Sequence, residues 1–267
     1  MSRRRIDSPK NANVKELLRL RERRARDRSE RFLIEGAREV ERALTAGVPL
    51  LEVLVAPEVA RPETLALASS AEASGIPVTE LSALAFERLS AREHPDGVMA
   101  LAPTWRTEPA DLRLPAKPLL LVLDGLEKPG NLGALLRTAD AVDADAVCVT
   151  GPGTDPFNPN VIRASMGSLF SRPLVTASTE GLRSFLASKS VRIVATSPAA
   201  EKPYWDADLT GGVAIVLGSE HEGLGSEWLQ GSDERVRIPM AGMADSLNVA
   251  TAGALLLYEA LRQRRAG

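Results

Sequence analysis

Three stretches of this chain combine polar side chains with glycines, as ligand-binding loops do. The last of them, residues 238–253, follows a short alternating strand and leads into an apolar helix that Asp245 or Ser246 would cap. Pro239, which has no N–H to donate, ends the strand pairing. A strand end, exposed backbone amides and a helix N-terminus together suit a polar or anionic ligand. A capped helix packed on a sheet, with no ligand, explains the same residues as well.

The other two stretches carry candidate catalytic side chains. Residues 124–140 contain Asn131 and, six residues later, Arg137, while residues 216–225 contain Glu220 in a glycine-rich segment. Each stretch follows a run of apolar residues typical of a buried strand. Loops that follow parallel strands meet at one edge of a sheet, so these side chains could share one site.

Several kinds of chemistry are disfavoured. The first stretch lacks the G-x-G-x-x-G spacing, and the next strand ends without the acidic residue that a dinucleotide site requires. There is no G-x-S-x-G sequence, and the histidines His94 and His221 lie in separate predicted domains, so no hydrolase nucleophile is indicated. The single cysteine, Cys148, lies in a strand-like run and is predicted to be a core residue, which excludes disulfides and cysteine-rich metal sites. We expect no metal.

Composition and charge indicate a globular protein that meets nucleic acid. Hydrophobic residues make up 44% and charged residues 25% of the 267, and no apolar run approaches the roughly 18 residues that span a bilayer. The three N-terminal arginines are not followed by a signal-peptide core, so a reducing cytoplasm is expected. Residues 1–31 carry twelve Lys or Arg against five Asp or Glu, whereas the remainder carries 21 against 30. A basic arm on an acidic body is typical of a protein with one RNA-binding end, although a solvated basic helix would look the same.

Residues 1–102 are predicted to form a small α/β domain. We expect residues 1–10 to be disordered and residues 13–28 to form one helix, with Arg19, Arg23 and Arg26 along one face. The proline-rich residues 103–117 are the predicted linker.

Residues 118–267 are predicted to form an α/β domain in which helices cover both faces of a mostly parallel sheet. Continuous Val, Ile and Leu runs mark most of its strands. The expected strands are 119–124, 146–150, 173–176, 191–196, 213–217 and 235–238, and the expected helices are 131–142, 158–170, 180–189 and 246–263.

Taken together, the three stretches resemble the SpoU family of RNA ribose methyltransferases, within the SPOUT superfamily. The resemblance covers about residues 118–263 and includes the intervening run from Asn158 to Ser168. The first hundred residues also resemble the ribosomal-protein-like substrate-binding domain that often precedes this catalytic domain. The motifs are Gly130-Asn131 with Arg137-Thr-Ala, Leu217-Gly218-Ser-Glu220 with Gly223-Leu, and Ile238-Pro-Met with Ser246-Leu247-Asn248-Val249.

The resemblance implies transfer of methyl from S-adenosylmethionine to a ribose 2'-OH, a deep trefoil knot, and a homodimer whose active site lies at the interface. Its implied catalytic set is Asn131, Arg137, Glu220, Ser246 and Asn248. Its implied donor-binding set is Thr196, Leu217, Gly218, Ile238 and Leu247.

An arginine with a pKa above about 12 is a poor general base, so we interpret Arg137 as a clamp on the substrate phosphate. Glu220 is the better candidate for accepting a proton or ordering Arg137. Arg163, with the N-terminal arginines, would contact RNA phosphates, which add affinity but no sequence information. We expect ribosomal RNA as substrate. A transfer RNA, methylation of a base, and a non-catalytic RNA- or ribosome-binding protein with the same fold are the alternatives.

Overall fold

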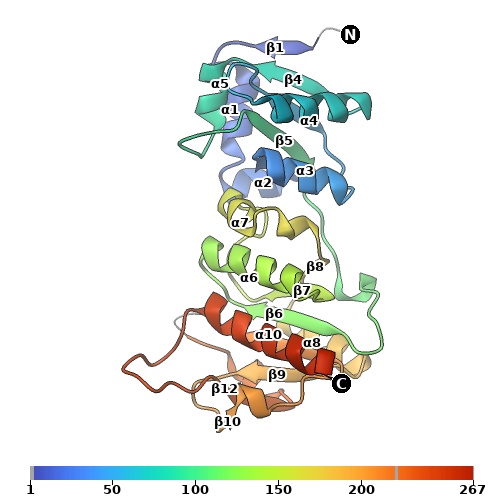
Figure 1. Ribbon diagram of the computed structural model, residues 1–267, viewed down its shortest axis with the longest axis vertical. Coiled ribbons are helices and arrows are strands. Elements are labelled where there is room, and N and C mark those ends of the chain that lie inside the picture. Colours follow the sequence, from blue (N-terminus) through green and yellow to red (C-terminus); the bar gives the residue numbers. More distant parts are fainter. Residues whose placement is uncertain (1–2, 220–221, 267) are drawn as a thin grey trace. The chain divides into compact units, whose positions relative to one another are not determined.

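The computed structural model describes residues 3–219 and 222–266, and the chain forms two compact units (Figure 1). Unit 1 comprises Met1–Trp105 and Asp155–Ser171, and unit 2 comprises Arg106–Thr154 and Arg172–Gly267. Asp155–Ser171 therefore lies in unit 1, although the sequence places it within the second predicted domain. Each unit has its own sheet.

The sheet of unit 1 has five strands in the order β1-β4-β3-β5-β2, with both parallel and antiparallel pairs. A core of aliphatic side chains and Phe86 packs between this sheet and helices α1 and α5. The elements of unit 1 are β1 Arg4–Ile6, α1 Ala12–Arg19, α2 Arg23–Ser29, β2 Arg31–Glu35, α3 Ala37–Thr45, β3 Glu52–Val55, α4 Pro62–Ala73, β4 Val78–Leu81, α5 Ala83–Leu89, β5 Val98–Pro103, α7 Pro159–Ser165 and the 3-10 turn Ser168–Phe170.

Two predictions for the N-terminal residues are wrong. The segment expected to be disordered contains β1, which extends the sheet by pairing in parallel with β4. The single helix expected over residues 13–28 is broken between α1 and α2, and the break is stabilised by Arg26. Its Nη1 donates to the carbonyl oxygens of Leu20 and Arg21, at 2.8 and 2.9 Å, which the break leaves without helical partners.

Asp155–Ser171 is held in unit 1 by an ion pair and an aromatic cluster. The Arg26 guanidinium lies 2.6 Å from Asp155, and the Arg26 side chain is only 2% exposed. The Phe157 ring packs between those of Phe32 and Trp105, with centroids 4.8 and 4.6 Å apart. Breaking a buried ion pair of this kind costs about 3–5 kcal/mol, because one charge is left without its partner.

Unit 2 is built on a seven-stranded parallel sheet in the order β10-β12-β9-β11-β6-β7-β8. The predicted strands are all present, and the two-residue β10 is additional. The elements of unit 2 are the 3-10 turn Pro109–Asp111, β6 Leu119–Asp124, α6 Pro129–Ala141, β7 Ala146–Thr150, β8 Leu174–Thr176, α8 Thr179–Ser188, β9 Arg192–Thr196, β10 Lys202–Pro203, the 3-10 turn Tyr204–Asp206, β11 Val213–Leu217, α9 Ser226–Gln230, β12 Glu234–Arg237 and α10 Val249–Ala266.

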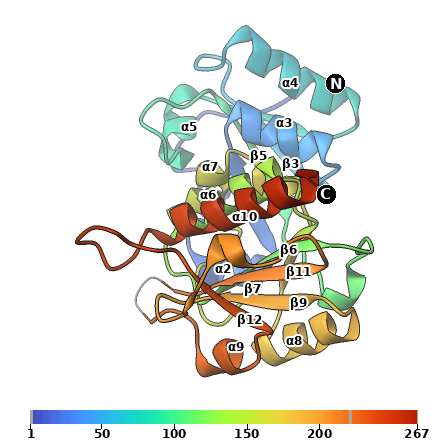
Figure 2. The same ribbon diagram turned by 60° about the horizontal axis from the view of Figure 1, so that its bottom comes forward.

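Helices cover both faces of this sheet, as predicted. Figure 2 shows α6 and α10 on one face and α8 and α9 on the other. Helix α10 crosses α6 closely at Gly253, where an added Cβ would lie 2.3 Å from Leu135 and 2.7 Å from Leu217. Near its C-terminal end, the Arg264 guanidinium donates to the carbonyl oxygens of Lys117, Pro118, Leu209 and Gly211. This arginine therefore fixes the end of α10 to the start of β6.

Candidate active site

The carboxyl ends of five parallel strands meet at one edge of the unit 2 sheet. Strands β12, β9, β11, β6 and β7 are neighbours in that order and run in the same direction. The loops that follow β6, β9, β11 and β12 therefore emerge side by side. Thr196 and Leu217 are the last residues of β9 and β11, and Gly218, Ile238, Ser246 and Leu247 follow β11 or β12. Asn131 and Arg137 lie on α6, and Asn248 directly precedes α10.

One contact joins the first and third motifs directly. The Asn248 Nδ2 donates a hydrogen bond of 3.1 Å to the Asn131 Oδ1. Asn248 also caps α10, because its Oδ1 accepts from the Ala250 N–H at 2.9 Å. The prediction that Asp245 or Ser246 caps this helix is therefore wrong, since the helix begins two to three residues later. Residues 117 positions apart in the sequence form one polar pair at the strand edge.

The loop after β11 closes tightly on itself. Ser219 and Gly223 exchange two backbone hydrogen bonds, each 3.1 Å long. A Cβ added to Gly218 would lie 2.2 Å from the Gly223 carbonyl carbon, so only glycine fits at this position. Glu220 and His221 lie outside the described residues.

The other predicted catalytic side chains are exposed. Arg137 lies on α6 and faces solvent, as does Ser246 in the loop before α10. That loop, residues 239–248, extends away from the rest of unit 2 in Figures 1 and 2 and exposes the whole Met243 side chain. A hydrogen bond therefore brings Asn131 and Asn248 together, whereas Arg137 and Ser246 are exposed on α6 and in the loop before α10.

The predicted donor-binding residues lie at the ends of β9, β11 and β12 and before α10. The Thr196 hydroxyl donates to the Val216 carbonyl at 3.0 Å, which ties β9 to β11, and Leu217 is buried. Ile238 is half-buried, whereas Leu247 is 36% exposed. The structure therefore brings Thr196, Leu217 and Gly218 to adjacent strand ends, and places Leu247 at the end of the extended loop.

Asp124 and Thr150, which sequence analysis did not single out, also lie at this edge. They end the paired strands β6 and β7, and the Thr150 hydroxyl donates to the Asp124 carboxylate at 2.7 Å. Each is a polar residue at the end of an apolar strand, and this pattern in the sequence could have indicated both of them.

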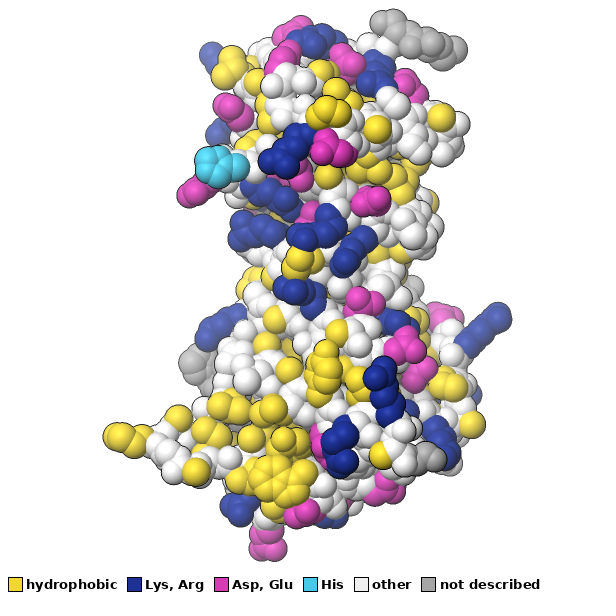
Figure 3. All heavy atoms as spheres, in the orientation of Figure 1, with side chains coloured by type: hydrophobic (Ala, Val, Ile, Leu, Met, Phe, Trp, Pro, Cys, Tyr) yellow, Lys and Arg dark blue, Asp and Glu magenta, His cyan; other side chains and the backbone are white. Residues whose placement is uncertain are grey.

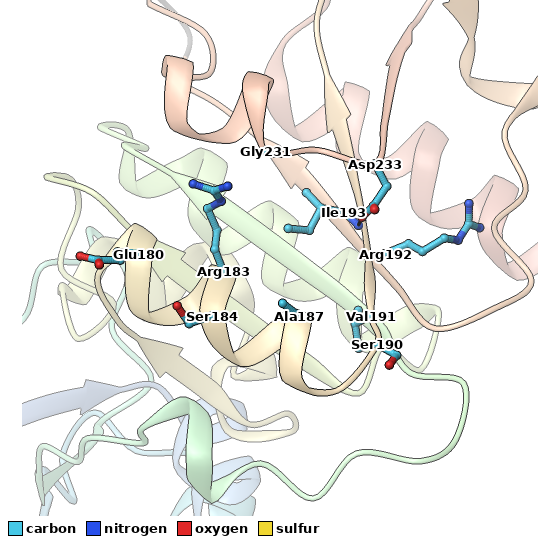
Figure 4. Close-up of a pocket in the computed structure, with 10 residues that line it drawn as sticks. All are labelled: Glu180, Arg183, Ser184, Ala187, Ser190, Val191, Arg192, Ile193, Gly231 and Asp233. Atoms are coloured by element: carbon cyan, nitrogen blue, oxygen red, sulfur yellow. Dashed lines mark hydrogen bonds between the residues drawn. The ribbon is translucent and has the colours of Figure 1, made fainter.

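A groove of about 610 Å³ lies elsewhere on unit 2 (Figure 4). It is lined by α8, by Arg192 and Ile193 at the amino end of β9, and by Gly231 and Asp233. Acidic and basic side chains alternate along it, and Asp233 accepts a hydrogen bond from the Ile193 N–H at 2.7 Å. It lies at the opposite end of β9 from Thr196, so it is not part of the strand-edge site.

The four arginines predicted to contact RNA differ in exposure. Arg19 and Arg23 are exposed on α1 and α2, and Arg163 is exposed on α7, where it donates to Asn160 at 3.1 Å. Arg26 is buried with Asp155, so the prediction that it shares an open face with Arg19 and Arg23 is wrong.

Three further observations concern the described residues alone. Among residues 3–219 and 222–266, no group of three or more His, Cys, Asp or Glu side chains is placed to hold a metal ion. No helix in this part of the chain is both long and apolar enough to cross a membrane. Cys148 is buried, as predicted, and burial raises the pKa of its thiol to about 12, so it is not a reactive nucleophile.

Two family models match the chain. The model of the SpoU rRNA Methylase family matches residues 118–258, and the model of the MRM3-like substrate binding domain matches residues 11–100. The first match covers the strand edge and all three motifs.

Known proteins resemble the chain over nearly its whole length. The 23S rRNA (guanosine(2553)-2'-O)-methyltransferase RlmP of Bacillus subtilis (strain 168) is 34% identical, with 95% of this chain and 97% of the relative covered. A 23S rRNA (uridine(2479)-2'-O)-methyltransferase of Streptomyces viridochromogenes is 30% identical, with 92% and 87% covered. Among solved structures, the AdoMet-bound rRNA methyltransferase of Sinorhizobium meliloti has a TM-score of 0.90 at 31% identity, with 97% of both chains covered. An RNA 2'-O ribose methyltransferase has a TM-score of 0.84 at 47% identity, with 98% of this chain and 99% of that chain covered.

Proposed function

Because the chain belongs to the SpoU rRNA methylase family, we propose that it methylates one ribose 2'-OH of 23S ribosomal RNA at the strand edge of unit 2. It is an S-adenosylmethionine-dependent RNA 2'-O-methyltransferase. The observation that carries the choice of site is the hydrogen bond between Asn131 and Asn248, which joins two of the three motifs. The named 23S relatives support ribosomal RNA as the substrate.

Backbone at the ends of β9, β11 and β12 would hold the methyl donor. Gly218 supports this assignment, because its close packing against Gly223 fixes the backbone at the end of β11. We assign Thr196, Leu217, Gly218, Ile238 and Leu247 to donor binding, with Ile238 and Leu247 as the apolar walls of an adenine slot. When bound, the donor supplies an electrophilic methyl group on a sulfonium.

The chain's own polar residues would place the ribose and stabilise charge. A secondary hydroxyl is a weak acid, so placement and electrostatics must supply much of the rate. We propose that Arg137 binds the substrate phosphate and lowers the cost of the developing alkoxide. Glu220 would accept the proton or order Arg137, while Ser246, Asn248 and Asn131 would orient the ribose and one another.

Substrate RNA would be held mainly through unit 1. Exposed Arg19, Arg23 and Arg163 are proposed phosphate contacts, which position RNA without reading its sequence. The Bacillus and Streptomyces relatives are named for a guanosine and a uridine, so similarity to them does not specify the base of the target nucleotide. We retain residues 1–102 as the substrate-binding domain, 103–117 as the linker and 118–267 as the catalytic domain.

We also propose a homodimer, a trefoil knot in unit 2 and a cytoplasmic location. The exposed apolar side chains Trp205, Leu255 and Tyr258 support the dimer. Figure 3 shows hydrophobic side chains gathered on the face that carries α10. Burial of these side chains against a second copy would bring two strand edges into one assembly.

The test is transfer of labelled methyl from S-adenosylmethionine to unmodified ribosomal and transfer RNA transcripts, followed by nuclease digestion and mass spectrometry. We expect a 2'-O-methylated nucleotide in 23S RNA. Methyl on a base, or on transfer RNA alone, would contradict the proposal. Donor binding without transfer would direct the assay to assembled ribosomal particles, and an absence of donor binding would favour a non-catalytic RNA-binding protein.

The proposed binding of the substrate phosphate by Arg137 is tested by Arg137→Lys, which keeps the charge but loses the bidentate hydrogen bonding of the guanidinium. We expect loss of most transfer activity with unchanged donor binding, measured by calorimetry. Turnover near the wild-type rate would remove Arg137 from the mechanism.

A further inference from the structure

The loops that follow β6 and β7 are joined beyond the end of the sheet. Pairing of the two strands ends at Asp124 and Thr150. After this pair, the Gly125 N–H donates to the Thr150 carbonyl at 2.9 Å, and the Thr154 N–H donates to the Leu126 carbonyl at 2.7 Å. These backbone bonds hold the first two residues of the loop that leads to α6.

Two threonine hydroxyls strengthen the connection. The Thr150 hydroxyl donates to the Asp124 carboxylate at 2.7 Å, and the Thr154 hydroxyl donates to the Glu127 carbonyl. A hydrogen bond to a carboxylate is stronger than one between neutral groups. Asp124, Thr150 and Thr154 thus form a clamp, and we use this name for the three residues below.

The two loops approach each other so closely that side chains are excluded. A Cβ added to Gly153 would lie 2.5 Å from the Leu126 carbonyl oxygen, and one added to Gly151 would lie 3.0 Å from the Asp124 carboxylate. Gly151 also has φ +69°, which disfavours other residues. The Leu126 side chain is buried and anchors the loop from below. The connection is therefore fixed by packing as well as by hydrogen bonds.

The clamp holds the residues that come just before Asn131 in the sequence. Glu127 is followed by Lys128, whose carbonyl accepts the Asn131 N–H at 3.1 Å in the first turn of α6. Asn131 in turn receives the hydrogen bond from Asn248. A fixed Glu127 carbonyl therefore sets where α6 begins and where the Asn131 amide points.

We infer that Asp124, Thr150 and Thr154 are positioning residues for methyl transfer, because they hold the loop before α6 so that Asn131 meets Asn248. This inference rests on the proposed function, in which Asn131 orients the ribose. A displacement of about 1 Å at a reacting centre can cost about 100-fold in rate. In this role the clamp acts through Asn131 and does not take part in the reaction directly.

The experiment compares Thr154→Val and Thr150→Val with the rescue variants Thr154→Ser and Thr150→Ser. Valine keeps the volume and removes the hydroxyl, while serine restores the hydroxyl. We expect each valine variant to lower the single-turnover transfer rate about tenfold, with the donor Kd changed less than about twofold. Each serine variant should recover most of the rate. The two positions are independent, so the test survives if one valine variant fails to fold.

Thr210→Val is the matched control. Its hydroxyl donates to the Asp208 carboxylate at 2.6 Å in the loop before the amino end of β11, so the variant loses a similar bond in unit 2 that is not in the clamp. We expect its transfer rate to equal that of the wild type. Equal losses in Thr210→Val and Thr154→Val would mean that the clamp contributes only to general stability and would overturn the inference, as would wild-type rates in both clamp variants.

Asn131→Ala separates this inference from the proposed function. If Asn131→Ala abolishes transfer while both clamp variants transfer normally, only the positioning role fails. If Asn131→Ala transfers at the wild-type rate, the proposed site and the inference fail together.

Discussion

Two loops at the same edge of the unit 2 sheet differ sharply in how they are held. The loop between β6 and α6 is fixed by the clamp, by Leu126 and by close glycine contacts. The loop between β12 and α10 is exposed from Ala241 to Asn248, and no hydrogen bond among the described residues involves residues 239–247. One side of the proposed site is formed in the single chain, whereas the other is open.

The fold alone orders the loop before α6, whereas the loop before α10 depends on a binding partner for its order. Ordering a residue costs about 1–2 kcal/mol of backbone entropy, so an unrestrained loop of this length is expensive to fix. We expect donor binding, a second copy of the chain, or both to order the loop from Pro239 to Leu247. The loop before α6 needs no such contribution, and it can present Asn131 at once.

The largest effect is expected at Gly218. Gly218→Ala places a Cβ against the Gly223 backbone, 2.2 Å away, so the loop must move from the strand ends. Methyl transfer should fall by at least about 100-fold, because misplaced backbone cannot hold the donor. Gly225→Ala is the control, since nothing lies within 4 Å of its Cβ position. Equal activity of the two variants would contradict the packing argument.

Substitutions at one glycine in each of two loops compare how strongly the loops are constrained, with the free energy of unfolding as the measure. Gly153→Ala forces a Cβ to within 2.5 Å of the Leu126 carbonyl oxygen, whereas Gly242→Ala meets nothing within 4 Å. Overpacking should lower the free energy of unfolding by about 1–3 kcal/mol in the first variant. The second should change it by less than about 0.5 kcal/mol. Denaturant titration measures both, and similar values would show that the loops are equally constrained.

The hydrogen bond between Asn131 and Asn248 links the fixed loop to the open one. A double-mutant cycle of Asn131→Ala and Asn248→Ala, read from transfer rates, should give a coupling of about 1 kcal/mol. The cycle cancels the separate role of Asn248 as helix cap. Strictly additive losses would mean that the two amides act independently.

The smallest effect concerns mobility. Saturating S-adenosylmethionine should slow amide hydrogen exchange in residues 239–247 by roughly threefold more than in residues 125–131. The reason is that only the first segment gains order on binding. Equal slowing of both segments would remove the distinction drawn between the loops.

Sequence patterns predicted the sheet of unit 2 well, because its strands are buried on both faces. Residues 119–123 and 213–217 are continuously apolar, and the predicted strands 119–124 and 213–217 match β6 and β11 residue for residue. The shared edge then follows from the alternation of strands and helices, which makes the strands parallel, whereas the order of the strands does not follow from it. The motifs could be assigned to loops at that edge for the same reason.

The unpredicted features depend on contacts between distant residues. The burial of Arg26 requires Asp155, which lies 129 positions away, so a local pattern of arginines suggested an open helix face instead. The choice of Asn248 as the cap of α10 likewise depends on where the helix meets Asn131, whereas Asp245 and Ser246 are equally good caps by residue type. The strand β1 forms only because β4 offers an unpaired edge.

The discontinuous unit 1 has a practical consequence for dissecting the enzyme. A fragment that begins at residue 118 would include Asp155 and Phe157 but lack Arg26, Phe32 and Trp105. It would leave a carboxylate without its cation and an aromatic ring in water, which favours aggregation. Soluble expression of the catalytic half by itself would therefore need polar replacements at Phe157, or co-expression with the N-terminal half.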